Sequence, residues 1–400
     1  MGRWLAVATC GAAAWGVVSS AEAQRILTAD PGEGQIRIVG TDRAVLSSER
    51  SRDDFPCRVE PLDPKLDYDL NFRAGYNILV PLAALAGKGD RLRILFRVTP
   101  LEGNSEPIYF RDTFRVPEIE EGIEGETTLT GRYRLGPGRY RINWLMRDRR
   151  ERVCSKSWET TAKVIEDVEG LAASPTPNTV RSDVEDLFFD EPPVMRKREA
   201  SERHVKILLN FTPLDRGKAG LSEYDQRSVL AMLRAFYREP EIGYFTLVAF
   251  SMEEERVFFE QSETTRIDFE GLGEAVGELR SGMVDFAKLQ DKESGLRFLE
   301  ELFAEHLSQA DKTPAAVVIL GPKLALDKNP PNSLLPPSRR IEAPIFHIIH
   351  NRNPRAYPWK DAIGAGLRGF RSEDYEVARP IHFGRVMRRV LERISAGPTS

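Results

Sequence analysis

The hydrophobic pattern of this chain changes its period near residue 203, and this change constrains the fold more than any other feature. Before it, apolar and polar residues alternate in short runs such as Leu92–Val98 and Arg139–Leu145. Such alternation is typical of strands with one buried face. After it, continuous apolar runs such as Val205–Phe211 are interleaved with apolar residues recurring every three to four positions. One chain therefore contains two folding units of different class.

The first unit, residues 33–165, shows seven or eight candidate strands with almost no helical periodicity. Turn residues separate these strands, among them Leu135–Gly138 and Asp148–Arg150. Many short strands at this spacing predict an all-β antiparallel sandwich. The expected strands lie at 35–39, 66–73, 92–98, 108–110, 113–116, 127–133, 139–145 and 153–164.

The run Leu135-Gly136-Pro137-Gly138-Arg139-Tyr140 resembles the entry to a late strand in immunoglobulin-like and fibronectin-like secreted domains. The resemblance implies that glycine supports the turn and that Tyr140 packs at the corner of the sandwich. The alternative is an ordinary hairpin turn, which leaves the fold prediction unchanged.

Residues 166–202 have the composition of a linker or extended arm, with the Pro-broken run Ser174–Asn178 and then Pro192–Pro193. Such a stretch rarely forms a core of its own. Within it, Leu187–Phe189 is the most apolar part. These three residues either dock on a neighbouring domain or bind a partner.

The second unit, residues 203–396, alternates strands with helices, which predicts a doubly wound, Rossmann-like α/β domain. The runs at 315–320 and 345–349 are of the continuous apolar kind found inside parallel sheets. Expected strands lie at 205–211, 244–250, 255–260, 315–320 and 345–349, and expected helices at 222–238, 269–279, 296–307 and 383–394.

The order of these elements is similar to that of a von Willebrand factor A-like domain. The run Phe245–Ser251, a charged turn and the return at Val257–Phe259 look like the second and third strands of that family. The resemblance covers residues 203–396 and implies a divalent cation at the top of the sheet. It also implies a D-x-S-x-S ligand motif directly after the first strand, because such a cation needs hard oxygen ligands.

The chain departs from that motif. It carries Asn210-Phe211-Thr212-Pro213-Leu214 at this place, and Asp215 is one residue out of register. The second acidic ligand would follow the strand at 315–320, where Lys323 stands instead and would repel a cation. We therefore expect a lost metal site and no cofactor. An alternative hypothesis keeps a Mg²⁺-dependent adhesion site built from Asp215, Thr212 and an acid whose position is open.

A scaffold without its cation still presents the loops at its strand ends, and we expect these loops to bind a protein partner. They are 210–217, 321–340 and 351–360, and long loops inside a compact domain are often functional. In the last of them aromatic residues stand beside arginine, the composition of an interface hot spot. The candidate binding residues are Asn210, Thr212, Asp215, Lys323, Arg352, Tyr357 and Trp359.

The third hypothesis is that the protein is an exported hydrolase that uses His347 or His350 with a nearby acid. Three positions apart on a strand, the two imidazoles should point to opposite faces, although a turn after Ile349 could bring both to the strand end. G-x-S-x-G, P-loop and H-E-x-x-H motifs are absent from the sequence. We therefore assign no catalytic residue and expect a protein that is not an enzyme.

The N-terminus has the three parts of a secretory signal peptide. A positive charge at Arg3 precedes the apolar stretch Trp4–Val18, and Ala21 and Ala23 form a small-x-small site. We predict cleavage after Ala23, removal of residues 1–23 and export to the periplasm or the exterior. The alternative is an uncleaved N-terminal anchor. After cleavage, the chain has no stretch of transmembrane length.

Two cysteines, Cys57 and Cys154, remain after this cleavage, and in an oxidising compartment they are expected to form a disulfide. The alternative is two unpaired thiols. The chain has 57 Lys and Arg against 61 Asp and Glu, a net charge of -4, with no basic stripe. This balance argues against a nucleic-acid partner.

Overall fold

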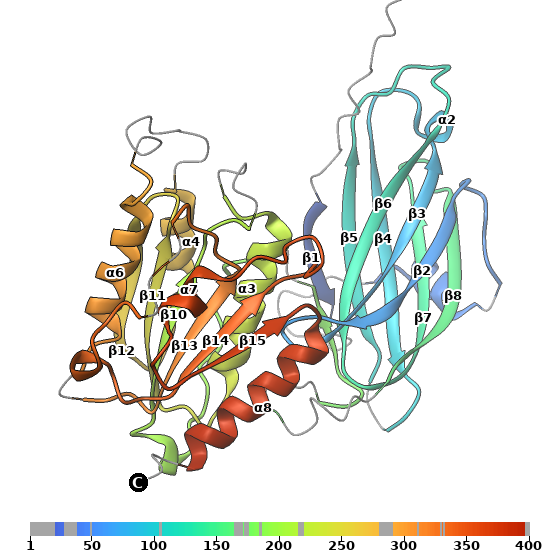
Figure 1. Cartoon of the computed structure of the whole chain (residues 1–400). Coiled ribbons are helices and arrows are strands. Elements are labelled where there is room, and N and C mark those ends of the chain that lie inside the picture. Colours follow the sequence, from blue (N-terminus) through green and yellow to red (C-terminus); the bar gives the residue numbers. More distant parts are fainter. Residues whose placement is uncertain are drawn as a thin grey trace, which may run out of the picture.

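The computed structural model of this chain describes residues 21–27, 38–48, 50–103, 106–163, 171, 176–183, 186–214, 220–279, 291–309, 312–328, 330 and 333–396. These residues form two antiparallel sheets in the N-terminal half and one mostly parallel sheet with helices in the C-terminal half (Figure 1). The predicted combination of an all-β unit and an α/β unit is therefore present.

The antiparallel sheets have the strand orders β1-β5-β4-β7-β8 and β2-β3-β6-β9. They enclose a shared aromatic core, in which the Tyr76 ring lies 5.4 Å from Phe96 and 5.5 Å from Trp144 between ring centres. The strands are β1 Ala21–Leu27, β2 Arg58–Leu66, β3 Phe72–Pro81, β4 Asp90–Pro100, β5 Ile108–Val116, β6 Glu126–Leu135, β7 Gly138–Arg147, β8 Val153–Ala162 and β9 Val180–Ser182, with short helices α1 Gly40–Ser47 and α2 Leu82–Leu85.

A disulfide joins the two sheets at one edge of this unit. Cys57 directly precedes β2 and Cys154 lies in β8, with their Cα atoms 6.2 Å apart. The pairing expected from the cysteine count is present. It connects the two layers across 97 positions of sequence.

The corner expected at Tyr140 is formed by hydrogen bonding. The Tyr140 hydroxyl lies 2.8 Å from the Gly136 carbonyl oxygen and 3.1 Å from that of Thr179. A Cβ atom at Gly136 would approach the Thr176 carbonyl oxygen to 2.0 Å, so only glycine fits there. This corner ties the start of β7 to the segment that leads into β9.

Two expectations in the N-terminal unit need correction. Residues 67–71, expected inside a strand at 66–73, form the turn between β2 and β3, and Leu70 has a φ of 61°. Residues 68–71 are all buried in this turn, and Tyr68 and Leu70 belong to the α/β core. In the strand expected at 35–39, residues 35–37 lie outside the described residues, and 38–39 lead into α1 instead.

The third sheet has the order β12-β11-β10-β13-β14-β15, and every pair is parallel except the edge pair β11–β12. Helices α3 and α8 pack on one face, and α6 and α7 on the other. The strands are β10 His204–Asn210, β11 Tyr244–Ser251, β12 Arg256–Thr264, β13 Ala316–Pro322, β14 Ile345–His350 and β15 Ser372–Val377, and the helices α3 Glu223–Arg238, α4 Phe269–Gly277, α6 Ser294–His306, α7 Ala362–Gly366 and α8 Pro380–Ala396.

The segment expected as a linker contacts both units. β9 pairs with β6, and Leu187 and Phe188 pack against the α/β core. The Arg234 guanidinium of α3 lies 4.1 Å from the centre of the Phe189 ring. Of the two roles expected for Leu187–Phe189, docking on a neighbouring domain is the one seen.

The predicted signal peptide falls mostly on residues 1–20, which lie outside the described residues, while the expected cleavage point lies in β1. Its cleavage stays a prediction. Among the described helices, none combines the length and the apolar character needed to cross a membrane.

Candidate functional site

The carboxyl ends of β10, β13 and β14 meet at one edge of the α/β sheet, where the candidate residues were expected. Asn210 ends β10 and is buried, and its Nδ2 donates to the Pro322 carbonyl at 3.0 Å. Asn210 Oδ1 accepts from the Thr212 amide at 2.9 Å. The buried Thr212 Oγ1 in turn accepts from the Met252 amide at 2.9 Å. Both side chains therefore hold strand ends together, while Asp215 lies outside the described residues.

Lys323, which follows β13, is 9% exposed and fastens the next loop. Its Nζ donates to the Tyr357 carbonyl at 3.0 Å and lies 3.8 Å from Glu376 Oε1. The same carboxylate accepts from Asn351 Nδ2 at 2.6 Å. This buried ammonium therefore holds both the loop after β14 and the end of β15.

The loop 351–361 has a fixed base and an exposed tip. At its end, Asp361 Oδ1 accepts from the Gly364 amide at 2.8 Å and caps α7, and Oδ2 accepts from the Leu324 amide at 2.6 Å. At the tip, the Tyr357 and Trp359 rings meet edge-on with centres 5.0 Å apart. Trp359 is 36% exposed. The anchored backbone thus presents an exposed tryptophan beside a half-buried tyrosine.

Arg352 lies nearer the start of this loop and is exposed. Its guanidinium carbon is 4.6 Å from the centre of the Tyr224 ring on α3, a cation–π distance. The loop is therefore also attached to the first turn of α3.

The two histidines of β14 have separate surroundings, as expected for opposite faces. The side chain of His347 is 3% exposed, with Nδ1 3.0 Å from Asp374 Oδ1 and Nε2 3.6 Å from Asp361 Oδ1. His350 lies toward α3, its Nδ1 3.7 Å from Asp225 Oδ1 and its Nε2 buried with no hydrogen bond. Burial lowers the pKa of His350 to about 4, so the ring is neutral near pH 7.

A side chain from the N-terminal unit covers this edge, which sequence reasoning missed. Tyr68, in the turn between β2 and β3, is 1% exposed and meets the His350 ring edge-on at 5.0 Å between centres. Burial and the neighbouring Tyr224 raise its pKa. The alternation at Leu66–Arg73 was the sequence signal that could have indicated this contact, but we interpreted it as a strand.

Charged side chains extend this contact between the units. Asp69 pairs with Arg134 of β6 and lies 4.0 Å from Arg238 Nη1 of α3. Arg238 Nη2 and Arg234 Nε lie 2.8 Å and 3.0 Å from Glu191 Oε1. Burial alone would raise the pKa of Asp69, but Arg134 and Arg238 hold it below its ordinary value. These buried pairs fix the turn on α3.

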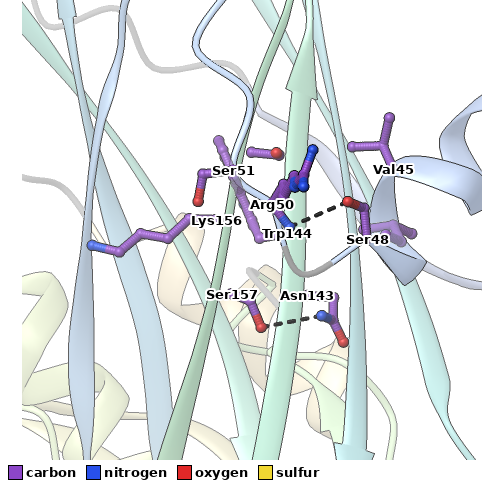
Figure 2. Close-up of a pocket in the computed structure, with 10 residues that line it drawn as sticks. Val45, Ser48, Arg50, Ser51, Asn143, Trp144, Lys156 and Ser157 are labelled. Atoms are coloured by element: carbon purple, nitrogen blue, oxygen red, sulfur yellow. Dashed lines mark hydrogen bonds between the residues drawn. The ribbon is translucent and has the colours of Figure 1, made fainter.

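A small hollow lies in the N-terminal unit, beside α1 and the strands β7 and β8 (Figure 2). Within it, Asn143 Nδ2 donates to Ser157 Oγ at 3.1 Å, and the Arg50 amide donates to Ser48 Oγ at 3.2 Å. Other polar groups of the lining bond outside it, since Ser155 Oγ accepts from the Arg52 amide and Lys156 Nζ donates to the Val59 carbonyl, both at 2.8 Å. The lining consists of Val45, Leu46, Ser48, Arg50, Ser51, Asn143, Trp144, Ser155, Lys156 and Ser157.

Comparisons with known proteins give no family. No family model matches the chain, and a search of curated proteins finds no match. A solved structure of Bacteroides uniformis β-glucuronidase is similar at 9% identity and a TM-score of 0.18, over 76% of this chain and 34% of that one. A second, β-glucuronidase 2 bound covalently to cyclophellitol-6-carboxylate aziridine, has 10% identity and a TM-score of 0.17, over 74% and 36%. Likeness at this level carries no argument about fold or activity.

Proposed function

We propose that this chain is an exported, non-enzymatic protein that binds a protein partner or supports an assembly in the cell envelope. In this proposal the N-terminal sheets are an immunoglobulin-like sandwich. The C-terminal unit is a von Willebrand factor A-like domain that has lost its cation site. The strand order, with one antiparallel hairpin at the sheet edge, supports the second assignment.

The observation that carries the proposal is the anchored loop 351–361 with Trp359 exposed at its tip. Exposed tryptophan beside tyrosine and arginine has the chemistry of an interface hot spot. The bonds of Lys323, Asn351 and Asp361 fix the backbone beneath it before any partner arrives. A loop held in this way loses little conformational entropy on binding, which favours affinity.

The hydrogen bonds of Asn210 and Thr212 favour binding without a metal. Each side chain already bonds to backbone groups at the end of a strand. Lys323 adds a buried positive charge where the second acidic ligand was expected. The Mg²⁺-dependent alternative rests on Asp215.

A carboxylate lies beside each histidine, as the hydrolase alternative requires, but neither imidazole is accessible to act as a general base. His347 is buried, its Nδ1 is 3.0 Å from Asp374 Oδ1, and its Nε2 faces Asp361 Oδ1 at 3.6 Å. His350 is covered by Tyr68. These surroundings favour a structural role for both side chains.

Site-specific photo-crosslinking tests the proposal. A benzophenone amino acid replaces Trp359 in the full chain, and in a control it replaces Lys312, whose side chain is 77% exposed and precedes β13. Both proteins are irradiated in native envelope extract. We expect a discrete crosslinked protein from position 359 only, competed by added wild-type chain and not by Trp359→Ala. The same products from both positions, or loss of the product on chelation of Mg²⁺, would contradict the proposal.

A further inference from the structure

A second group of chemically active side chains lies on the α6 face of the sheet. Glu260 is on the edge strand β12, opposite Val248 of β11, whose side chain belongs to the core beneath α6. Residues paired across strands point to the same face, so Glu260 points toward α6. Glu305 and His306 end that helix. Two elements distant in sequence thus place two carboxylates and one imidazole together.

The geometry of this cluster is compact. One potential ligand atom from each of the three residues lies within 4.8 Å of the other two. Glu260 and Glu305 are exposed, whereas His306 is 4% exposed. His306 Nε2 lies 3.9 Å from Glu305 Oε2 and is buried with no hydrogen-bond partner. A buried ring nitrogen without a partner is costly, so a missing ligand beside the carboxylates would explain it.

We propose that Glu260, Glu305 and His306 bind a divalent transition-metal ion of the Zn²⁺ type, with water completing the coordination. One imidazole nitrogen with carboxylate oxygens suits such an ion, whereas Mg²⁺ and Ca²⁺ favour oxygen ligands alone. Tetrahedral coordination at the usual bond lengths needs ligand atoms about 3.3 Å apart. The two exposed glutamates can close this gap by rotating. The carboxyl end of α6 adds the negative end of its helix dipole.

Lys206 of β10 places a positive charge beside the proposed zinc site. Its Nζ donates to the His306 carbonyl at 3.3 Å, and both glutamates act on it electrostatically. A divalent ion would be repelled by this ammonium, so the site should bind zinc at moderate affinity. Removing the positive charge of Lys206 should therefore strengthen zinc binding, whereas loss of a ligand should weaken it.

Isothermal titration of the full chain with Zn²⁺ tests the proposal. Glu260→Gln and Glu305→Gln remove exposed ligands without disturbing the core, and Lys206→Met removes the opposing charge. Glu301→Gln is the matched control, because Glu301 is exposed one turn earlier on the same helix. We expect one Zn²⁺ per chain, affinity about tenfold or more weaker in either ligand variant, unchanged affinity in the control and tighter binding in Lys206→Met.

Absence of a one-to-one zinc complex would overturn the proposal. It would also be overturned if Glu260→Gln and Glu305→Gln bound zinc like Glu301→Gln, since the ion would then be held by other histidines. Titration with Mg²⁺ in place of Zn²⁺ should show no saturable binding at this site. These outcomes are independent of the Trp359 experiment, which concerns a different edge of the sheet.

Discussion

Replacing Tyr68 by alanine should weaken the α/β unit, although Tyr68 belongs in sequence to the β-rich unit. Its ring is 1% exposed and lies against His350, within the core cluster of the α/β sheet. Removing a fully buried aromatic ring costs about 3–5 kcal/mol, because the burial is lost and a cavity remains. For a unit of this size, that corresponds to a fall in melting temperature of about 10 °C.

Differential scanning calorimetry with hydrogen exchange measures this effect and locates it. In Tyr68→Ala the transition of the α/β unit should shift, and exchange should speed up at the start of α3 and the end of β14. Amides of β4 and β7 should keep their protection, because their contacts lie in the other core. Tyr68→Phe is the control and should change stability by less than about 1 kcal/mol, because it keeps the buried ring and its contact with His350.

The opposite pattern would refute this account of the contact between the units. If Tyr68→Ala lowered only the stability of the β-rich unit, the turn would be supporting its own sheets. An unchanged exchange rate near Asn351 and Asp225 would lead to the same conclusion.

Three further predictions concern single features of the fold. Replacing Cys57 and Cys154 by serine should cost about 4–5 kcal/mol in urea unfolding, because the disulfide closes a loop across 97 positions; an unchanged midpoint would contradict this. The pKa of His350 is about 4 in the folded chain, below the ordinary 6.5, so on acidification the unfolded chain takes up this proton at a higher pH than the folded chain. About 3 kcal/mol of stability present above pH 6.5 should therefore be lost by pH 4. His350→Phe should remove that part of the pH dependence, measured by denaturant unfolding across this range. Tyr140→Phe should cost about 1 kcal/mol through the lost bond to Gly136, and an unchanged urea midpoint would count against the corner.

Helix α3 shows what sequence could predict. The spacing of its apolar residues predicted a helix at 222–238, and the structure has Glu223–Arg238. Ser222 is its N-cap and accepts from the Asp225 amide. The spacing is a local signal, so it survives in the sequence alone. Strand β15 was not predicted, because this edge strand is polar and only Val377 is fully buried in it.

Tyr68 shows where sequence reasoning fails. Alternation predicts burial, but it does not say which unit supplies the other half of the core. For the candidate site, sequence placed Asn210 and Lys323 at strand ends. Their partners, Pro322 and Tyr357, were not predictable because tertiary contacts select them.

We propose that the edge loop with Trp359 binds a protein without the help of a metal. The most direct measurement is the affinity of the purified crosslinked partner for the wild-type chain and for Trp359→Ala, each with Mg²⁺ and after chelation. We expect at least about a tenfold loss of affinity in Trp359→Ala and no change of affinity on chelation. Equal affinity of the two chains, or binding that appears only with Mg²⁺, would contradict it.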